Sequence, residues 1–291
     1  MHEPVLKEQV LEYLNPKPGF IVLDATVGGG GHTEALAERV LPSGMILGLD
    51  QDEEAIKHVK ARLARFGQHV QIVESNFRNL DQVLSQYPDL KFDAALFDLG
   101  FSSDQIADSK RGFSFMADAP LDMRMSLKFD LKAADLINSL SERELADIFW
   151  KYGEEHASRR IAKVIVEERR TRPVQTTFDL LRMLEKAGLR RKGKAHPATK
   201  VFQALRIAVN DELGACEEGI RKAISVLKSG GRIATITFHS LEDRIVKNLF
   251  KAEEKEGRVK IITRKVVMPS RAEVLKNPRA RSAKLRVAER V

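Results

Sequence analysis

Short apolar runs rich in Val and Ile alternate with helix-forming segments through the first third of the chain. The runs occupy residues 20–24, 45–50, 70–74 and 92–98, and a fifth follows at 232–238. Between them, apolar residues recur at helical spacing, as in 32–40 and 53–66. Such alternation is typical of a parallel sheet covered by helices on both faces. The sequence therefore predicts an α/β fold.

The pattern changes after residue 98, where helical segments replace the alternation. Ser141 and Glu144 have the spacing of a capping box that opens one helix, and Gly153 closes it. Further helices are predicted at 154–170, 177–187, 198–212 and 217–227. We expect a sheet domain in two parts, split by a small all-helical insertion domain, with the boundaries 1–108, 109–205 and 206–291.

Positive charge is concentrated in two stretches of the chain. Residues 258–291 carry a net charge of +9 and residues 182–206 carry +7, whereas the whole chain of 291 residues carries +8. The remainder is therefore acidic, and the asymmetry indicates a polyanionic partner. The alternative, that these side chains only cover solvated surfaces, stays open.

Several classes of protein are excluded by composition. A single cysteine, Cys216, rules out a disulfide framework and a cysteine-based zinc site. The seven histidines show no ligand spacing with acids nearby, so no metal is expected. The N-terminus lacks a basic segment followed by an apolar one, and no window reaches the roughly 18 apolar residues of a membrane helix. We expect a cytoplasmic protein that does not bind membranes.

Four consecutive glycines, Gly28 to Gly31, follow the first apolar run and precede a helical segment. Glycines at a strand-to-helix junction let a ligand approach the backbone, although a tight turn also accepts them. Asp50 closes the second run, 22 residues after Gly28, where a carboxylate can accept the ribose hydroxyls of an adenosine. The pattern indicates a nucleotide-type cofactor.

The charge around these glycines favours one cofactor over another. Counting from Gly28 or from Gly29, the third glycine of the dinucleotide fingerprint is replaced by Thr33 or Glu34. Asp24 precedes the loop and would repel a pyrophosphate, but it tolerates the sulfonium and amino groups of S-adenosylmethionine. We therefore predict S-adenosylmethionine, and a nicotinamide dehydrogenase is the disfavoured alternative.

Longer motifs spread over the whole chain carry a family resemblance. They are His2-Glu3-Pro4-Val5-Leu6, Gly30-Gly31-His32, Asp98-Leu99-Gly100, Arg111-Gly112-Phe113-Ser114-Phe115, Pro120-Leu121-Asp122-Met123-Arg124-Met125, Phe202-Gln203-Ala204-Leu205-Arg206, Phe238-His239-Ser240-Leu241-Glu242-Asp243-Arg244 and Asn277-Pro278-Arg279-Ala280-Arg281-Ser282. With them the chain closely resembles the RsmH (MraW) family, bacterial methyltransferases that act on a cytosine N4 of 16S ribosomal RNA.

The resemblance implies a class I, Rossmann-like methyltransferase sheet interrupted by a helical domain. It also implies a cytidine in the decoding region of 16S ribosomal RNA as the substrate, in the naked RNA or in the small ribosomal subunit. Carried over by motif, the cofactor contacts are Gly30, Gly31, His32, Asp50, Phe77, Asp98 and Gln105. Phe101 and Asp104 depart from the family's usual Val and Pro beside Gln105.

Methylation of a cytosine amine needs hydrogen-bond acceptors, because the lone pair of that nitrogen is shared with the ring. The loop after the fourth run offers Asp98, Ser102 and Ser103; we predict Asp98 near the cofactor amine and a serine facing the base. His239 follows the fifth run and either orients the base, takes its proton or is structural. Ser240 with Asp243 has the form of a helix cap.

Cations near the predicted catalytic face and in the basic tail are the candidates for RNA binding. They are Arg111, Arg124, Lys200, Arg206, Arg279, Arg281, Lys284 and Arg286. The apolar residues between Arg111 and Arg124, namely Phe113, Phe115, Met116 and Met123, either stack on an extruded base or pack in the core.

Two matters stay open on the sequence alone. The first is a non-catalytic alternative, a ribosome-assembly factor that binds RNA and uses the cofactor pocket only structurally. The second is whether the protein forms a homodimer.

Overall fold

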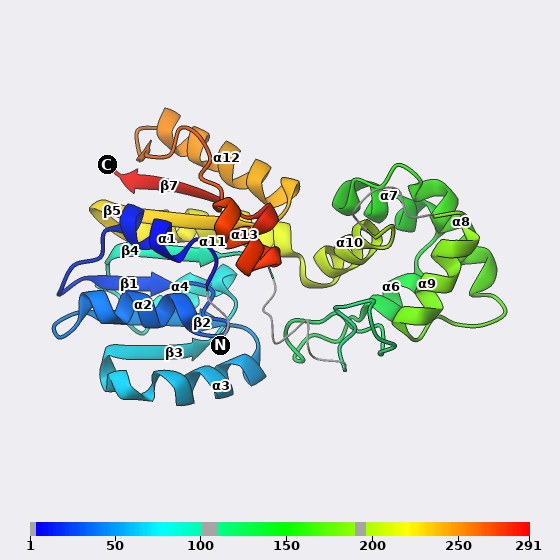
Figure 1. Ribbon diagram of the computed structural model, residues 1–291, viewed down its shortest axis with the longest axis horizontal. Helices are drawn as coiled ribbons and strands as arrows, with labels where there is room; N and C mark the ends of the chain where they lie inside the picture. Colours follow the sequence, from blue (N-terminus) through cyan, green and yellow to red (C-terminus); the bar gives the residue numbers. More distant parts are fainter. Residues whose placement is uncertain (1–3, 101–109, 190–195) are drawn as a thin grey trace. The chain divides into compact units, whose positions relative to one another are not determined.

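The structure is a computed structural model, and it describes residues 4–100, 110–189 and 196–291. The chain divides into two compact units (Figure 1). The sheet unit comprises Met1–Phe101 and Leu213–Val291, and the helical unit comprises Ser102–Glu212. In the described residues, no helix is both long enough and apolar enough to cross a membrane.

The sheet unit contains a seven-stranded sheet with the strand order β3-β2-β1-β4-β5-β7-β6. The strands are β1 (Ile21–Asp24), β2 (Met45–Asp50), β3 (Val70–Glu74), β4 (Phe92–Asp98), β5 (Leu227–Thr237), β6 (Val259–Ile261) and β7 (Lys284–Arg290). The first five are parallel, whereas β7 runs antiparallel to both β5 and β6. The five predicted strands are confirmed, and β6 and β7 are additional.

Helices cover both faces of this sheet because side chains of each central strand alternate between two cores. In β4, Ala94 and Leu96 face one core, and Ala95 and Phe97 face the other. The first core packs against α1 (Lys7–Leu14), α2 (Gly31–Val40) and α3 (Glu53–Leu63). The second packs against α4 (Leu80–Leu84), α11 (Glu212–Val226) and α12 (Ser240–Lys255). In Figure 1, α1 and α2 lie in front of the strands and α11 lies behind them.

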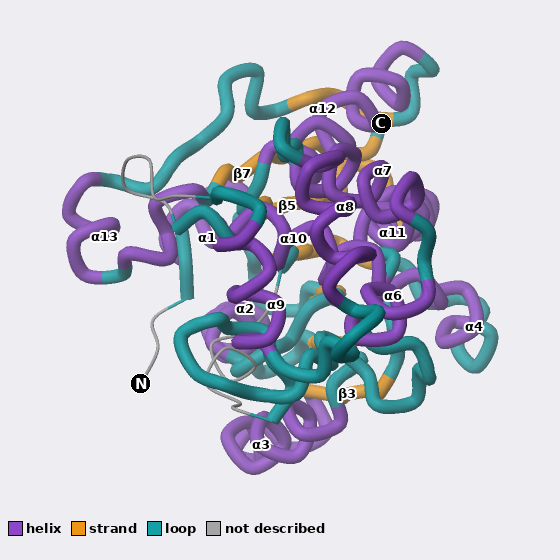
Figure 2. Tube along the Cα trace, turned by 90° about the vertical axis from the view of Figure 1, so that its right-hand side faces the viewer, coloured by secondary structure: helices purple, strands orange, loops and turns teal. Residues whose placement is uncertain are grey.

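Short elements complete the sheet unit. They are the 3-10 helices η1 (Ala64–His69), η2 (Phe77–Asn79) and η3 (Pro278–Ser282), and the helix α13 (Arg271–Lys276). Figure 2 shows α13 beyond α1, on the side of α1 that faces away from the strands.

The helical unit is built from α6 (Ala133–Ser139), α7 (Glu142–Gly153), α8 (Ser158–Glu168), α9 (Thr177–Lys186) and α10 (Thr199–Asn210). The predicted capping box is confirmed: Ser141 Oγ accepts from Glu144 N, and Glu144 Oε2 accepts from Ser141 N. The second helix begins at Ser158, later than predicted, because Glu154 adopts a left-handed conformation (φ 49°) that ends α7.

The helical unit extends past residue 205, where the sequence suggests its end. Helix α10 continues without a break to Asn210, and its buried residues Leu205 and Val209 pack in the same core as Phe149. A continuous helix buried along one core belongs to that core, so the compact unit reaches Glu212. The other expected boundary, at 108, lies outside the described residues.

Candidate cofactor and active site

Three aspartates end neighbouring parallel strands of the sheet unit. Asp24 ends β1, Asp50 ends β2 and Asp98 ends β4. Because the carboxyl ends of parallel strands meet at one edge of a sheet, the three carboxylates gather at the edge where open α/β sheets bind ligands. The loop that carries the glycines leaves the sheet at the same edge.

Asp24 is fully buried and ties the end of β1 to the helix that follows. Its Oδ2 accepts a hydrogen bond from Thr33 Oγ1 at 2.7 Å, and its Oδ1 accepts from Thr26 N at 3.2 Å. Burial raises the pKa of Asp24 to about 6, and the charge of Asp50 adds to this increase. A dinucleotide-binding fold has glycine at the position of Thr33. Here the Thr33 hydroxyl holds the Asp24 carboxylate in place.

Asp50 holds the glycine loop from the other side. Its Oδ2 accepts from Gly28 N at 2.8 Å, and its Oδ1 accepts from Asp52 N at 2.9 Å. Burial raises the pKa of this carboxyl as well. The bond to Gly28 fixes the distance between the loop and β2. A ribose contact of Asp50 stays a prediction.

Two of the four glycines are required by the packing of the loop. Gly30 has φ 78° and caps α2, and a Cβ there would lie 2.4 Å from Val59 Cγ2. A Cβ on Gly31 would lie 2.9 Å from Pro4 Cγ. The start of α2 thus packs closely against α3 and the N-terminal segment. This packing fixes the arrangement of the loop amides.

The buried His32 and the half-buried Asp98 form a pair of polar side chains at this edge. Asp98 Oδ2 lies 3.6 Å from His32 Nε2. In the described part of the chain, Asp98 Oδ1 and His32 Nε2 have no hydrogen-bond partner. Buried polar groups are normally satisfied, so such atoms indicate a place that a ligand completes.

The titration of this pair follows from burial and from the neighbouring acids. Burial, together with the negative charges of Asp24 and Glu242, raises the pKa of Asp98 to about 8. Burial also lowers the pKa of His32 to about 4, against a hydrogen bond to the backbone of Val5. At neutral pH His32 is neutral and Asp98 is largely protonated. A cation brought to this edge would favour the Asp98 carboxylate.

Phe77 opens η2 directly after β3 and is half-buried. Its ring lies edge-to-face on Phe97 with centroids 5.4 Å apart. A Cβ on Gly219 of α11 would lie 2.5 Å from Phe77 Cδ2, so the ring also fills the space beside that helix. The structure thus gives Phe77 a packing role, and an adenine contact stays a prediction.

His239 caps α12 together with Glu242, which the sequence analysis missed. Its Nδ1 accepts from Glu242 N at 3.4 Å, and its Nε2 lies 3.1 Å from Glu242 Oε1. Glu242 is buried, and its Oε2 accepts from Phe238 N at 2.9 Å. The cap predicted from Ser240 and Asp243 is wrong by one residue, because the side chain that points back onto the free amide is that of His239. The three-residue spacing from His239 to Glu242 was the available signal.

Three of the predicted site residues cannot be placed. Ser102, Ser103 and Gln105 lie outside the described residues. Up to that point the chain after β4 is held at the sheet edge, since Leu99 N donates to Ile236 O at 2.9 Å.

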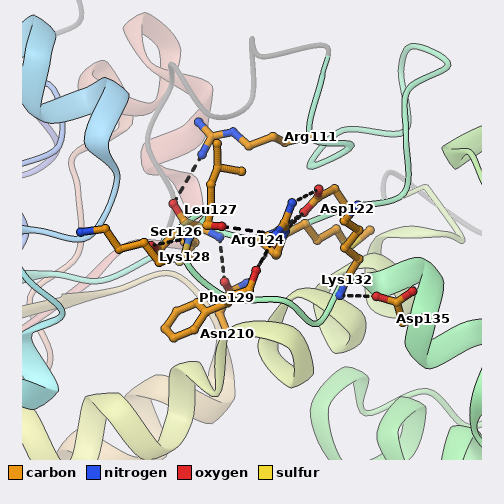
Figure 3. Close-up of polar contacts among 12 residues, drawn as sticks. Arg111, Asp122, Arg124, Ser126, Leu127, Lys128, Phe129, Lys132, Asp135 and Asn210 are labelled. Carbon is orange, nitrogen blue, oxygen red and sulfur yellow. Dashed lines mark hydrogen bonds and ion pairs between the residues drawn. The ribbon is translucent and has the colours of Figure 1, made fainter.

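The loop around Arg124 differs from what the sequence suggests (Figure 3). Arg124 Nε and Nη2 donate to the two oxygens of Asp122 at 2.7 and 2.9 Å, and Arg124 Nη1 donates to the carbonyls of Leu127 and Phe129. Arg111 is buried, and its Nη1 donates to Met125 O at 3.4 Å. Both guanidinium groups hold this loop in place.

The apolar residues of the same segment fall into two groups. Phe113 and Met123 are buried in the core of the helical unit. Phe115 stacks on His196 with ring centroids 4.6 Å apart, and Met116 is 81% exposed. Only the second group offers a surface to a base.

The remaining candidate cations also separate by their partners. Arg206 is buried and forms a bidentate ion pair with Glu212, in which Nε and Nη2 donate to Oε1 and Oε2 at 2.8 and 2.9 Å. Lys284 and Arg286 of β7 pair with Asp243 at 3.2 and 2.7 Å. The other three candidates are exposed: Lys200, whose Nζ donates to Glu154 O, together with Arg279 and Arg281 of η3.

Comparison with known proteins identifies the family. The model of the MraW methylase family matches residues 1–291. The chain belongs to this family. Among curated MraW relatives, Ribosomal RNA small subunit methyltransferase H of Clostridioides difficile is 45% identical over 308 residues, which cover 100% of this chain and 99% of the relative. The protein of the same name from Carboxydothermus hydrogenoformans is 46% identical over 306 residues, covering 100% and 98%.

Solved structures support the fold of this MraW methylase. A protein of Clostridium thermocellum that carries the provisional name rRNA-methylase has a TM-score of 0.51 at 14% identity, with 100% of both chains covered. At this identity the similarity shows the fold alone. Together with the sheet order, it confirms the predicted methyltransferase sheet with a helical interruption.

Proposed function

We propose that this protein transfers a methyl group from S-adenosylmethionine to the exocyclic N4 of a cytidine in 16S ribosomal RNA. Family membership and the name shared by the curated relatives support methylation of small-subunit ribosomal RNA. The observation that carries the cofactor assignment is the unpartnered, buried Asp98 Oδ1 beside a second buried carboxylate, Asp24.

The donor set fits this cofactor chemically. Burial and the charges of Asp24 and Glu242 raise the pKa of Asp98. A cationic ligand would favour its carboxylate, whereas a pyrophosphate would add further repulsion. Asp50 offers carboxylate oxygens for ribose hydroxyls, and the loop at Gly30 and Gly31 presents backbone close by. When bound, S-adenosylmethionine supplies a methyl group already activated on a sulfonium. The proposed contacts therefore remain Gly30, Gly31, His32, Asp50, Phe77, Asp98 and Gln105.

The chain's own task is to position the acceptor nitrogen and to localise its lone pair. Oxygens of Ser102 and Ser103 are proposed to accept from the cytosine amine. Nδ1 of His239 accepts from Glu242 N, and Nε2 lies 3.1 Å from Glu242 Oε1, so the ring is held at the start of α12. We therefore assign His239 a positioning role at the turn into α12.

The test is a nucleoside analysis of the modified RNA. Purified protein is incubated with S-adenosylmethionine and small ribosomal subunits that lack the modification, and the digested RNA is analysed by mass spectrometry. We expect N4-methylcytidine with the wild-type protein and none with Asp98→Asn. A different methylated nucleoside would refute the N4 assignment. Cofactor binding without any methylated nucleoside would refute the catalytic role and favour the assembly factor.

A further inference from the structure

The segment between β6 and β7 carries most of its charge on the outside. Residues 264–283 contain six basic side chains and one acidic side chain, Glu273. Arg271, Lys276, Arg279 and Arg281 are all exposed. Glu273 is turned the other way, since its Oε1 accepts from Leu6 N of the N-terminal segment at 2.7 Å. The outer surface of this segment is therefore almost purely cationic.

This segment is held firmly to the sheet unit, so its cations keep a defined spacing. Ser270 Oγ caps α13 by accepting from Glu273 N at 3.1 Å, and Asn277 Oδ1 caps η3 by accepting from Arg279 N at 3.2 Å. Ala280 and Ala283 are fully buried in the core that contains α1. Val267 pairs with Leu285 of β7 in an antiparallel bridge. Ordered cations lose less entropy on binding than those of a flexible tail.

The neighbouring cations of β7 differ from those of α13 and η3 because they form ion pairs within the protein. Lys284 and Arg286 are half-buried and face Asp243, at 3.2 and 2.7 Å. Arg264 likewise pairs with Glu254 at 2.8 Å. Arg264, Lys284 and Arg286 thus have carboxylate partners, whereas Arg271, Lys276 and Arg281 of α13 and η3 are exposed.

Two apolar side chains are interleaved with these cations. Leu275 is 75% exposed and Met268 is 56% exposed. Helix α13 has only six residues and buries none of them, so it has no continuous apolar face to lie on a membrane. Mixed cationic and apolar contacts suit a polymer that offers phosphates and sugar or base edges side by side.

We propose that residues 265–281 form an RNA-binding surface, the tail surface, that holds the substrate RNA through its phosphates. The proposal rests on the proposed function, which supplies RNA as the polyanion. It excludes Lys284 and Arg286 from RNA binding and adds Arg271 and Lys276 to Arg279 and Arg281. The tail surface contributes affinity to every RNA sequence, because phosphate contacts carry no base information.

The experiment compares two variants that each lose three positive charges. The tail variant is Arg271→Gln/Lys276→Gln/Arg281→Gln. The control variant is Arg39→Gln/Lys247→Gln/Lys251→Gln, which neutralises three exposed cations of α2 and α12 in the same unit. Binding to unmodified small ribosomal subunits and to 16S ribosomal RNA is measured across a range of salt concentrations, and S-adenosylmethionine affinity is measured in parallel as a check on folding.

We expect the tail variant to bind RNA on the order of tenfold more weakly, with a slope of log K against log salt that is shallower by about 2. Its cofactor affinity should stay as in the wild type. The control variant should change RNA affinity less than about twofold and keep the wild-type slope.

Several outcomes would overturn the proposal. Equal losses in both variants would show a general charge effect, and an unchanged slope in the tail variant would show that these cations do not meet phosphates. Binding to vesicles of anionic phospholipid that the tail variant loses, with RNA binding intact, would assign the surface to a membrane.

If the wild-type protein binds the subunits through the tail surface but methylates nothing, the proposed function fails and the binding surface stands.

Discussion

The two units of the molecule treat their buried polar groups in opposite ways. In the helical unit, Asn210 Nδ2 donates to Met123 O and Asn210 Oδ1 accepts from Met125 N, both at 2.8 Å, and buried Arg206 meets Glu212. In the sheet unit, Asp98 Oδ1 and His32 Nε2 are left without a partner in the described residues. Within the described residues, the buried side-chain polar atoms that have no hydrogen-bond partner all belong to the sheet unit.

The difference shows where the protein loses folding free energy at a place that a ligand can occupy. A desolvated carboxyl group near like charges costs folding free energy, and it persists only where a ligand repays that cost. This cost falls at the carboxyl edge of the sheet, whereas the buried Arg206 of the helical unit has a carboxylate partner in Glu212.

Asp98→Asn should abolish function and at the same time stabilise the protein. We expect methylation to fall about 100-fold or more, because the carboxylate that meets the cofactor's positive charge is lost. Without cofactor, the variant should be more stable than the wild type by about 1–2 kcal/mol at pH 8. Methylation rates and thermal unfolding with and without S-adenosylmethionine measure both effects.

The sign of this stability change follows from the pKa of Asp98. That pKa is raised in the folded protein from 3.8 to about 8, so ionisation costs stability increasingly as the pH rises through this interval. Asn does not titrate, and the gap between the proteins should therefore shrink toward pH 4. A variant less stable than the wild type at pH 8 would show that Asp98 is a structural anchor.

Phe149→Ala tests whether the helical unit is an independent core. Phe149 is fully buried in α7, and its truncation should destabilise that unit by about 3–5 kcal/mol. Cofactor affinity should change little, because all of the proposed cofactor contacts except Gln105 belong to the sheet unit. Urea unfolding followed by the fluorescence of Trp150, the single tryptophan, reports on the helical unit, and equilibrium binding reports on the sheet unit. A parallel loss of cofactor binding would contradict the independence of the two units.

Cofactor binding should release a proton from Asp98. Since a bound cation favours the carboxylate, affinity should rise up to about tenfold per pH unit between about pH 6.5 and pH 7.5. Calorimetry in two buffers with different ionisation enthalpies measures the proton directly. Asp98→Asn should bind with little dependence on pH in this range. A flat profile for the wild type would mean that Asp98 is already ionised in the free protein.

Ser141→Ala tests the contribution of a single hydrogen-bonded cap in the helical unit, and it has the smallest expected effect on stability. The variant loses the oxygen that caps α7 at Glu144 N and should destabilise the helical unit by about 1 kcal/mol. Ser141→Asp, which restores an acceptor, should recover most of this loss. Equal stabilities of the Ala and Asp variants, measured by urea unfolding, would show that the cap contributes nothing.

The parts of the site that sequence analysis located are those with local signals. Asp24, Asp50 and Asp98 each end a predicted strand, and strand ends are readable from neighbouring residues alone. Parallel pairing then brings the three carboxylates to one edge. The capping box at Ser141 was readable for the same reason, since its two members are three residues apart.

Sequence analysis did not find pairs whose partners are distant in the sequence. Lys284 and Arg286, which the sequence proposes as RNA contacts, pair with Asp243, which lies 41 and 43 residues away, and the RNA contact stays a prediction. The signal for β7 was the alternation of Leu285 and Val287 with charged residues, which is weak in a basic tail.

The sequence by itself determined the fold class, the interruption by helices and the acidic, glycine-rich edge of the sheet, because these depend on periodicity and on nearby turns. Only the tertiary structure decided which charged side chains form ion pairs within the protein and which are exposed. The pKa of Asp98 depends on burial and on the charges of Asp24 and of Glu242, which lies in the first turn of α12, 144 residues further along the chain. The outward charge of the tail surface depends on the bond between Glu273 and Leu6. Burial and pairing are set by contacts between distant segments, and these contacts exist only once the chain has folded.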